Sequence, residues 1–266
     1  MEGIARKLAD FVAGSKFSDL PDNLVYQAKL LLLDSIGCAI RGNSMESGRI
    51  SVELARSLGG IEESTIIGTS NRVSCANAAF ANGQLISALD YNPMCTMNDV
   101  PSMVAAALVL AEREPASGQE LMLSVILGLE INKRIAYAAP LEGISSSVFG
   151  AVASAGRMLQ AEPEKLANAI GLAGYICPPE RTVMKYTSNH PANMTRYGPM
   201  GWVAQIGVTS ALLANMGFTS DKKVFETEWN YWKFVGKSEW DSASVLKDLG
   251  TNWQTHIEFK LYPGGI

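Results

Sequence analysis

The sequence predicts an all-α protein, and two features of its 266 residues carry that prediction. Apolar residues recur every three or four positions along most of the chain, which is the spacing of a helix that buries one face. Small residues gather on the expected helix faces, as in Ala105–Ala107 and Gly150–Gly156, and allow helices to approach closely. Because 47% of the residues are hydrophobic and 18% are charged, the chain can fill a large interior.

Cap and turn residues divide the first part of the chain into helices. Residues 2–14 are amphipathic and predict the first helix. Ser18, Asp19 and Pro21 form a start signal for a second helix, which stops at Gly42.

The next elements follow from glycines, β-branched residues and a polar cluster. A third helix is expected over about 47–58, before Gly59–Gly60. The β-branched segment 64–68 predicts a small strand or an extended link. A helix over 77–89 then ends in the polar cluster Asp90–Pro93. Further helices are expected at about 101–114, 117–138, 146–159, 163–174 and 201–216.

The remaining segments are predicted to contain fewer long helices. Residues 176–199 contain four prolines and predict a long ordered loop of the kind that is usually functional. The Trp-rich segment 225–240 predicts irregular structure with short helices. Polar and apolar residues alternate over 254–262, which predicts a strand.

Charge and cysteine content argue against several classes of protein. Lys and Arg occur at most in adjacent pairs and the net charge is −4, so no nucleic-acid surface is expected. No two of the four cysteines form a Cys-x-x-Cys pair and the chain has two histidines, which argues against a structural zinc site. Free thiols and the lack of a signal-peptide core favour the cytoplasm. The most apolar stretch, 30–40, contains Asp34 and is too short to span a membrane.

Short sequence phrases spread over nearly the whole chain resemble the MmgE/PrpD family. They are Leu32–Ala39, Ala88–Asn92, Pro101–Ser102, Ala107–Glu112, Ser117–Leu121, Gly128–Ile131 with Arg134, Arg196–Trp202, Gly207–Val208, Ala211–Ala214, Gly217–Thr219 and Phe259–Pro263. The resemblance implies a large helical domain and a smaller α+β domain, commonly in a dimer, in proteins much longer than this chain. We therefore expect residues 1–252 to form the helical domain and 253–266 to be the first strand of a truncated α+β domain.

The family includes 2-methylcitrate dehydratase, cis-aconitate decarboxylase and iminodisuccinate epimerase. The resemblance implies a lyase or isomerase that acts on a small di- or tricarboxylic acid without a metal or another cofactor. Removing a proton next to a carboxylate requires a base, an acid, and cationic groups that absorb the developing negative charge.

The resemblance places candidate site residues at both ends of the predicted fold. Asp90 matches the acidic residue of the family's Leu-Asp-(Tyr/Phe)-Asp-Asp stretch, with Tyr91 and Asn92 beside it. Lys260 and Tyr262 match a Lys-x-Tyr-Pro stretch. We expect Asp90, Tyr91 and Lys260 to be catalytic, and Asn92 and Tyr262 to bind substrate. The alternatives are a polar turn at Asp90 and a structural ion pair at Lys260.

The Pro-rich loop and its end supply the other candidates. Arg196 aligns with a family lysine and would grip a carboxylate, with Tyr197 next to it. Lys185 and His190 are candidate proton carriers, and His190 titrates near neutral pH. The alternatives are a surface charge at Arg196 and an exposed loop histidine at His190.

Three positions depart from the family pattern. Met94 and Val100 stand where relatives often have Thr and His, and Ile144 aligns with a second family histidine. None of these side chains can move a proton, so three interpretations stay open. The chain is an active enzyme, a catalytically impaired relative that keeps a dimeric scaffold, or one subunit of a split enzyme. The expected partners are a polycarboxylate substrate, a second copy of the chain and, in the last case, a second chain that supplies the missing domain.

Overall fold

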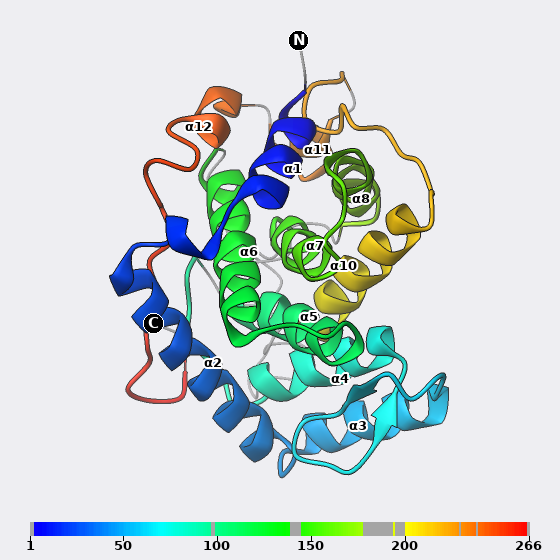
Figure 1. The fold of residues 1–266 in the computed structure, drawn as a ribbon. Helices are drawn as coiled ribbons and strands as arrows, with labels where there is room; N and C mark the ends of the chain where they lie inside the picture. Colours follow the sequence, from blue (N-terminus) through cyan, green and yellow to red (C-terminus); the bar gives the residue numbers. More distant parts are fainter. Residues whose placement is uncertain are drawn as a thin grey trace.

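A computed structural model describes residues 3–96, 99–138, 145–177, 194, 200–228, 230–237 and 239–264. These residues form a helical assembly, which confirms the predicted fold class (Figure 1). The helices are α1 (Ile4–Gly14), η1 (Phe17–Asp19, a 3-10 turn), α2 (Asp22–Gly42), α3 (Glu46–Leu58), α4 (Cys75–Ser87), α5 (Val100–Arg113), α6 (Gly118–Ala138), α7 (Ser147–Met158), α8 (Pro163–Ile176), α10 (Met200–Asn215), α11 (Tyr231–Phe234) and α12 (Ser242–Leu246).

The middle of the assembly consists of α5, α6, α7 and α10, while α1, α2, α3 and α12 lie around them (Figure 1). Helix α7 is buried along almost its whole length, and α6 is buried from Leu123 to Ala136. Helix α7 is apolar on nearly all sides and belongs in the core, because it has no face suited to water, whereas α6 also buries a few charged side chains. These central helices supply the rigid frame on which the candidate site is built.

Glycines bring the central helices into close contact. A Cβ added to Gly128 of α6 would lie 2.7 Å from the carbonyl oxygen of Gly150 in α7. A Cβ added to Gly201 of α10 would lie 2.2 Å from the carbonyl oxygen of Phe80 in α4. Both distances are shorter than side chains allow, so the backbones touch at positions where only glycine fits. The small residues read from the sequence therefore do pack helices closely at these crossings.

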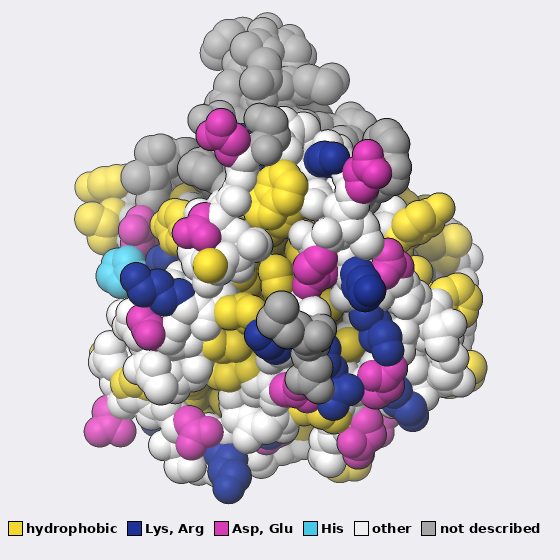
Figure 2. Space-filling view, turned by 90° about the horizontal axis from the view of Figure 1, so that it is seen from above, with side chains coloured by type: hydrophobic (Ala, Val, Ile, Leu, Met, Phe, Trp, Pro, Cys, Tyr) yellow, Lys and Arg dark blue, Asp and Glu magenta, His cyan; other side chains and the backbone are white. Residues whose placement is uncertain are grey.

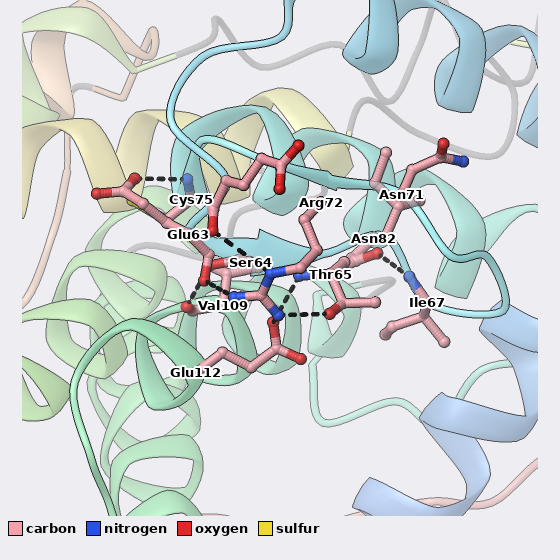
Figure 3. A network of polar contacts seen from close by, with 12 residues as sticks. Glu63, Ser64, Thr65, Ile67, Asn71, Arg72, Cys75, Asn82, Val109 and Glu112 are labelled. Carbon is pink, nitrogen blue, oxygen red and sulfur yellow. Dashed lines mark hydrogen bonds and ion pairs between the residues drawn. The ribbon is translucent and has the colours of Figure 1, made fainter.

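A short hairpin covers the outer ends of α4 and α5. Strands β1 (Ser64–Thr65) and β2 (Arg72–Val73) are antiparallel and lie where the sequence predicts a strand or an extended link. Figure 3 shows its polar attachments. Asn82 of α4 donates to the carbonyl oxygen of Thr65 at 3.0 Å, and Ser64 donates to the carbonyl oxygen of Val109 in α5 at 2.6 Å. The network pairs polar groups of the hairpin with the helices, so its role is structural.

The C-terminal part differs from the prediction in one respect. The Trp-rich segment holds short helices, as expected, but residues 254–262 do not form a continuous strand. Their β-pairing in the described residues is a single antiparallel bridge between Glu258 and Met94. Polar and apolar residues alternate over 254–262, but the segment beside them is the short loop that contains Met94 and not a second strand. The domain division at residue 252 stays a prediction.

The surface carries charges of both signs. On the face in Figure 2, Lys and Arg side chains lie among Asp and Glu side chains rather than gathering in one region. In the part of the chain that the structure describes, no helix combines the length and apolar character that crossing a membrane requires.

Candidate functional site

The structure brings together two predicted site residues that lie 170 positions apart, Asp90 and Lys260. The Nζ of Lys260 donates to Oδ1 of Asp90 at 2.8 Å and to its carbonyl oxygen at 3.0 Å. The lysine side chain is 2% exposed and the aspartate side chain is 13% exposed. An ammonium this well buried needs a charged partner, because an isolated charge in the interior is very costly.

Asp90 is held in a tight turn directly after α4. Its φ of +50° lies in the left-handed region, which Asp and Asn adopt more readily than most other residues. Its N–H donates to the carbonyl oxygen of Ser87 at 3.0 Å, and its own carbonyl oxygen accepts from the N–H of Gly264 at 2.8 Å. The turn therefore directs two oxygens of Asp90, one from the backbone and one from the side chain, at the C-terminal segment.

Helix α2 lies near enough to Lys260 for the lysine charge to act on a thiol of that helix. Burial, together with the nearby Asp34 carboxylate, raises the pKa of the Cys38 thiol to about 12, and the positive charge of Lys260 partly opposes that rise. The Cys38 thiol donates to Oδ2 of Asp34 at 3.7 Å, and burial raises the pKa of Asp34. The predicted phrase Leu32–Ala39 thus contributes a carboxyl and a thiol near Lys260, which the sequence alone does not reveal.

The other predicted residues within the described segments differ in their placement. Tyr91 is half-buried and packs against the core. Asn92 is fully buried and donates from Nδ2 to the carbonyl oxygen of Pro93 at 2.9 Å. Tyr262 is 81% exposed and does not join the Asp90–Lys260 pair. Tyr91 and Asn92 therefore line the turn that carries Asp90, while Tyr262 lies at the surface.

Four predicted site residues lie outside the described residues, and so does one position that departs from the family pattern. They are Lys185, His190, Arg196, Tyr197 and Ile144. Their roles stay predictions.

The two described departures from the family pattern have structural roles. Met94 forms the backbone bridge with Glu258, whose N–H donates to the carbonyl oxygen of Met94 at 2.8 Å. Val100 is the first residue of α5 and is fully buried in the core. Neither side chain brings a proton donor or acceptor to the Asp90–Lys260 pair.

A buried carboxylate beside these positions escaped the sequence analysis. Asp99 precedes α5, and its Oδ1 accepts from the N–H groups of Cys95 at 3.2 Å and Val100 at 3.0 Å. Its Oδ2 accepts from Oγ1 of Thr96 and from Nδ2 of Asn132, each at 2.5 Å. Burial raises the pKa of Asp99, while the hydrogen bonds from Thr96 and Cys95 oppose the rise. The cluster anchors the loop after Asp90 to helix α6.

A second buried network joins α6 to the segment before Lys260. Arg134 and Glu130 pair at 2.7 Å with side chains that are 0% and 1% exposed. Glu130 also accepts from the N–H of Gln254 at 2.9 Å and from the N–H of Thr255 at 2.8 Å. The sequence contains a sign of this network, because two opposite charges four residues apart interrupt an otherwise apolar stretch of the predicted helix.

A hollow of about 680 Å³ lies elsewhere and lacks the sequence-predicted site residues. It is lined by the ends of α1, α6, α7 and α8, including Asp10, Glu120, Arg157 and Glu162. Arg157 pairs with Glu120 and donates to the carbonyl oxygen of Ala13 at 2.9 Å, so its charge is already engaged. Three carboxylates, those of Asp10, Glu120 and Glu162, also line the hollow, so it is poorly suited to a substrate that carries several carboxylates.

No group of three or more His, Cys, Asp or Glu side chains within the described ranges is arranged to hold a metal ion. The side chains at the candidate site are a lysine with carboxylates and a thiol around it. Such a set can hold or move protons, and the lysine can meet an anion only in exchange for its contact with Asp90.

Comparison with known proteins identifies several relatives of the chain. A cis-aconitate decarboxylase-like protein, oryM, of Aspergillus oryzae is 27% identical over 97% of this chain and 58% of its own length. The cis-aconitate decarboxylase of Aspergillus terreus is 26% identical, over 98% of this chain and 57% of its own length. The human cis-aconitate decarboxylase is 24% identical, over 100% of this chain and 57% of its own length. The chain thus spans little more than half of the curated relatives it matches.

The family comparison covers most of the chain. The model that describes the MmgE/PrpD N-terminal domain matches residues 6–243, from α1 to the start of α12. Lys260 lies beyond that match, but within the stretch that aligns with the human relative. With the helical fold and the extent of this match, the chain belongs to the MmgE/PrpD family.

Proposed function

We propose that this chain is the helical part of a metal-independent lyase that acts on a small tricarboxylic acid resembling cis-aconitate. The names of its relatives support the reaction class. The observation that carries the proposal is the buried Lys260 ammonium, held by both oxygens of the Asp90 turn.

The proposed chemistry requires a cation where negative charge develops. When a carboxylate leaves as CO₂, the electron pair of the broken C–C bond passes into the remaining unsaturated acid, and one proton must return to carbon. A lysine ammonium in a site with little water stabilises that charge strongly and can supply the proton. Asp90 then holds the lysine in place between turnovers. An isomerase of the same family type would use the same pair to remove and return a proton.

The test measures binding and turnover of cis-aconitate. Calorimetry gives the affinity of the wild-type chain, and NMR of the acid detects any product. Lys260→Met keeps the length of the side chain but removes its charge, and should weaken binding by roughly tenfold or more, since a charged hydrogen bond is lost. Lys29→Met removes an exposed lysine of α2 and is the matched control. Equal affinity of the two variants would refute a role for Lys260.

A second candidate function rests on Met94 and Val100. Neither supplies a proton-transfer group, which favours a catalytically impaired or split family member that serves as a scaffold or subunit. This alternative predicts that the isolated chain binds a tricarboxylic acid but does not turn it over. Recovery of turnover on adding a second chain that corresponds to the C-terminal part of the relatives would identify the split enzyme, and no recovery would leave the scaffold.

We also propose that the chain is cytoplasmic and assembles with a second copy of itself. Large apolar side chains are exposed on α2 and α3, among them Leu33 at 71%, Ile40 at 56% and Ile50 at 53%. Leu33 and Ile40 are seven residues apart, so they lie on the same face of α2, and an exposed apolar face of this kind can mark an interaction site. Light scattering should give the mass of a dimer for the wild type and of a monomer for Leu33→Glu. A wild-type monomer at all concentrations would refute the assembly.

A further inference from the structure

The segment that carries Lys260 is attached to helix α6 shortly before the lysine. Thr255 donates twice to Oε2 of Glu130, from its N–H at 2.8 Å and from its hydroxyl at 2.7 Å. The N–H of Gln254 donates to the same carboxylate at 2.9 Å. Glu130 is 1% exposed, so these bonds are shielded from water. A carboxylate thus fixes two consecutive residues only five or six positions before Lys260.

Arg134 prevents that carboxylate from turning away. Its Nε donates to Oε1 of Glu130 at 2.7 Å, and its Nη atoms donate to the carbonyl oxygens of Lys247 and Asn252, each at 2.7 Å. Because guanidinium is planar and its donors are fixed in direction, these contacts define one geometry. The stretch from 247 to 255 is therefore held against a single turn of α6.

The next contact links this anchored segment to the Asp90–Lys260 pair. Glu258 and Met94 exchange backbone hydrogen bonds at 2.8 and 2.9 Å, and Lys260 follows two residues later. Met94 belongs to the loop that Asp99 and Asn132 anchor to α6. Side chains of α6 thus anchor the segment that precedes Lys260 and the loop that follows Asp90.

We infer that Glu130 is a positioning residue for Lys260, and that its Arg134-braced carboxylate sets where the lysine ammonium meets Asp90 and the substrate. The inference rests on the proposed function in one respect, the contact between Lys260 and a carboxylate substrate. An ion pair that served only the interior of α6 would not direct three hydrogen bonds at residues 254–255.

The main test uses Thr255→Val, which removes one hydrogen bond to Glu130 and keeps the side-chain shape. Acetic anhydride labels accessible amines, and mass spectrometry of the folded protein gives the rate at Lys260. We expect that rate to rise by roughly tenfold, since a hydrogen bond to a charged group is lost. The affinity for cis-aconitate should fall alongside it. Ser64→Ala is the matched control, because it removes another buried hydroxyl bond, 2.6 Å long, far along the chain.

A second variant keeps the test decisive where the first does not fold. Glu130→Gln preserves the shape of the side chain but loses its charge, and hydrogen exchange of the 254–260 amides reports the release of the segment directly. We expect faster exchange there in Glu130→Gln and unchanged exchange in Ser64→Ala.

Three results would overturn the inference. The first is a Lys260 labelling rate that is unchanged in Thr255→Val and in Glu130→Gln. The second is an equal rise of that rate in Ser64→Ala, which would mean that the whole fold has loosened. The third is faster labelling with unchanged cis-aconitate affinity. If the wild type binds no tricarboxylic acid, the proposed function fails by itself, and labelling and exchange alone decide whether Glu130 positions Lys260.

Discussion

At the scale of single residues, Asp90 combines a backbone and a side-chain requirement. Its positive φ strains most residues, whereas Asp and Asn tolerate it. Its carboxylate is also the charged partner of a nearly buried lysine. The two requirements can be separated, because Asn satisfies the first and Ala satisfies neither.

Stability should therefore fall in two steps. Asp90→Asn should lower the free energy of unfolding by about 1.5–3 kcal/mol, since the charged hydrogen bond to Lys260 weakens. Asp90→Ala should lose a further 1–2 kcal/mol or so through left-handed strain. Urea unfolding of the three proteins measures both steps. Equal stability of the Asn and Ala variants would show that the turn imposes no such strain.

The residues of the candidate site could be proposed from the sequence only where the family phrases reach. Asp90 and Lys260 were both identified that way, and the structure pairs them although no local pattern links positions so far apart. Glu130 and Asp99 were missed because periodicity assigns a residue to a face without saying which distant backbone it contacts. Tyr262 matched a family phrase, yet its side chain is exposed.

At the scale of elements, the helices were predictable because each buries a face whose spacing is visible in the sequence. The ends of α6 and α7 fall within about one residue of the predicted ranges. The segment 254–262 was less predictable, because a strand requires a partner and the sequence does not say what lies beside it. Close helix crossings were predictable as a tendency of small residues, but not as particular pairs.

Two glycine substitutions should have opposite effects on stability. Gly201→Ala places a methyl group 2.2 Å from a carbonyl oxygen of α4 and should cost about 1–3 kcal/mol or more. Gly37 is an exposed position of α2, where an added methyl group would have nothing within 4 Å, so Gly37→Ala should stabilise by roughly 0.5–1 kcal/mol. Thermal unfolding of both variants measures the difference. A neutral Gly201→Ala would mean that α4 and α10 separate at little cost.

At the scale of the whole molecule, the four cysteines lie in distant parts of one core. Cys38 is in α2, Cys75 in α4, Cys95 in the loop before α5 and Cys177 after α8, and all four are buried. Burial raises the pKa of Cys75 to about 11 and of Cys177 to about 12. Because the thiolate is the reactive form, native thiols should be inert near pH 8.

Thiol titration should therefore report global unfolding. We expect a disulfide reagent to react slowly at pH 8 in buffer, and with all four thiols in one phase once denaturant unfolds the chain. Rapid reaction of one thiol in the native protein would reveal local opening at its position.

The raised thiol pKa values also predict how the stability of the folded state changes with pH. The folded state holds these protons more tightly than the unfolded chain, where the thiol pKa is 9.0. Their contribution to stability is thus complete below about pH 9 and is lost as the pH rises toward 12. Denaturant midpoints at successive pH values should decline over this window, less steeply in Cys95→Ala.

The separation of 170 residues between Asp90 and Lys260 also has a consequence in time. A ribosome that adds about 5–20 residues per second needs roughly 10–30 s to make that stretch. During this interval the growing chain has the carboxylate but not the ammonium, and α6 holds a paired Glu130 and Arg134 whose backbone partners do not yet exist. The nascent helical core must keep its shape through this interval, because the Asp90–Lys260 contact can form only long after α4 and α6 have been made.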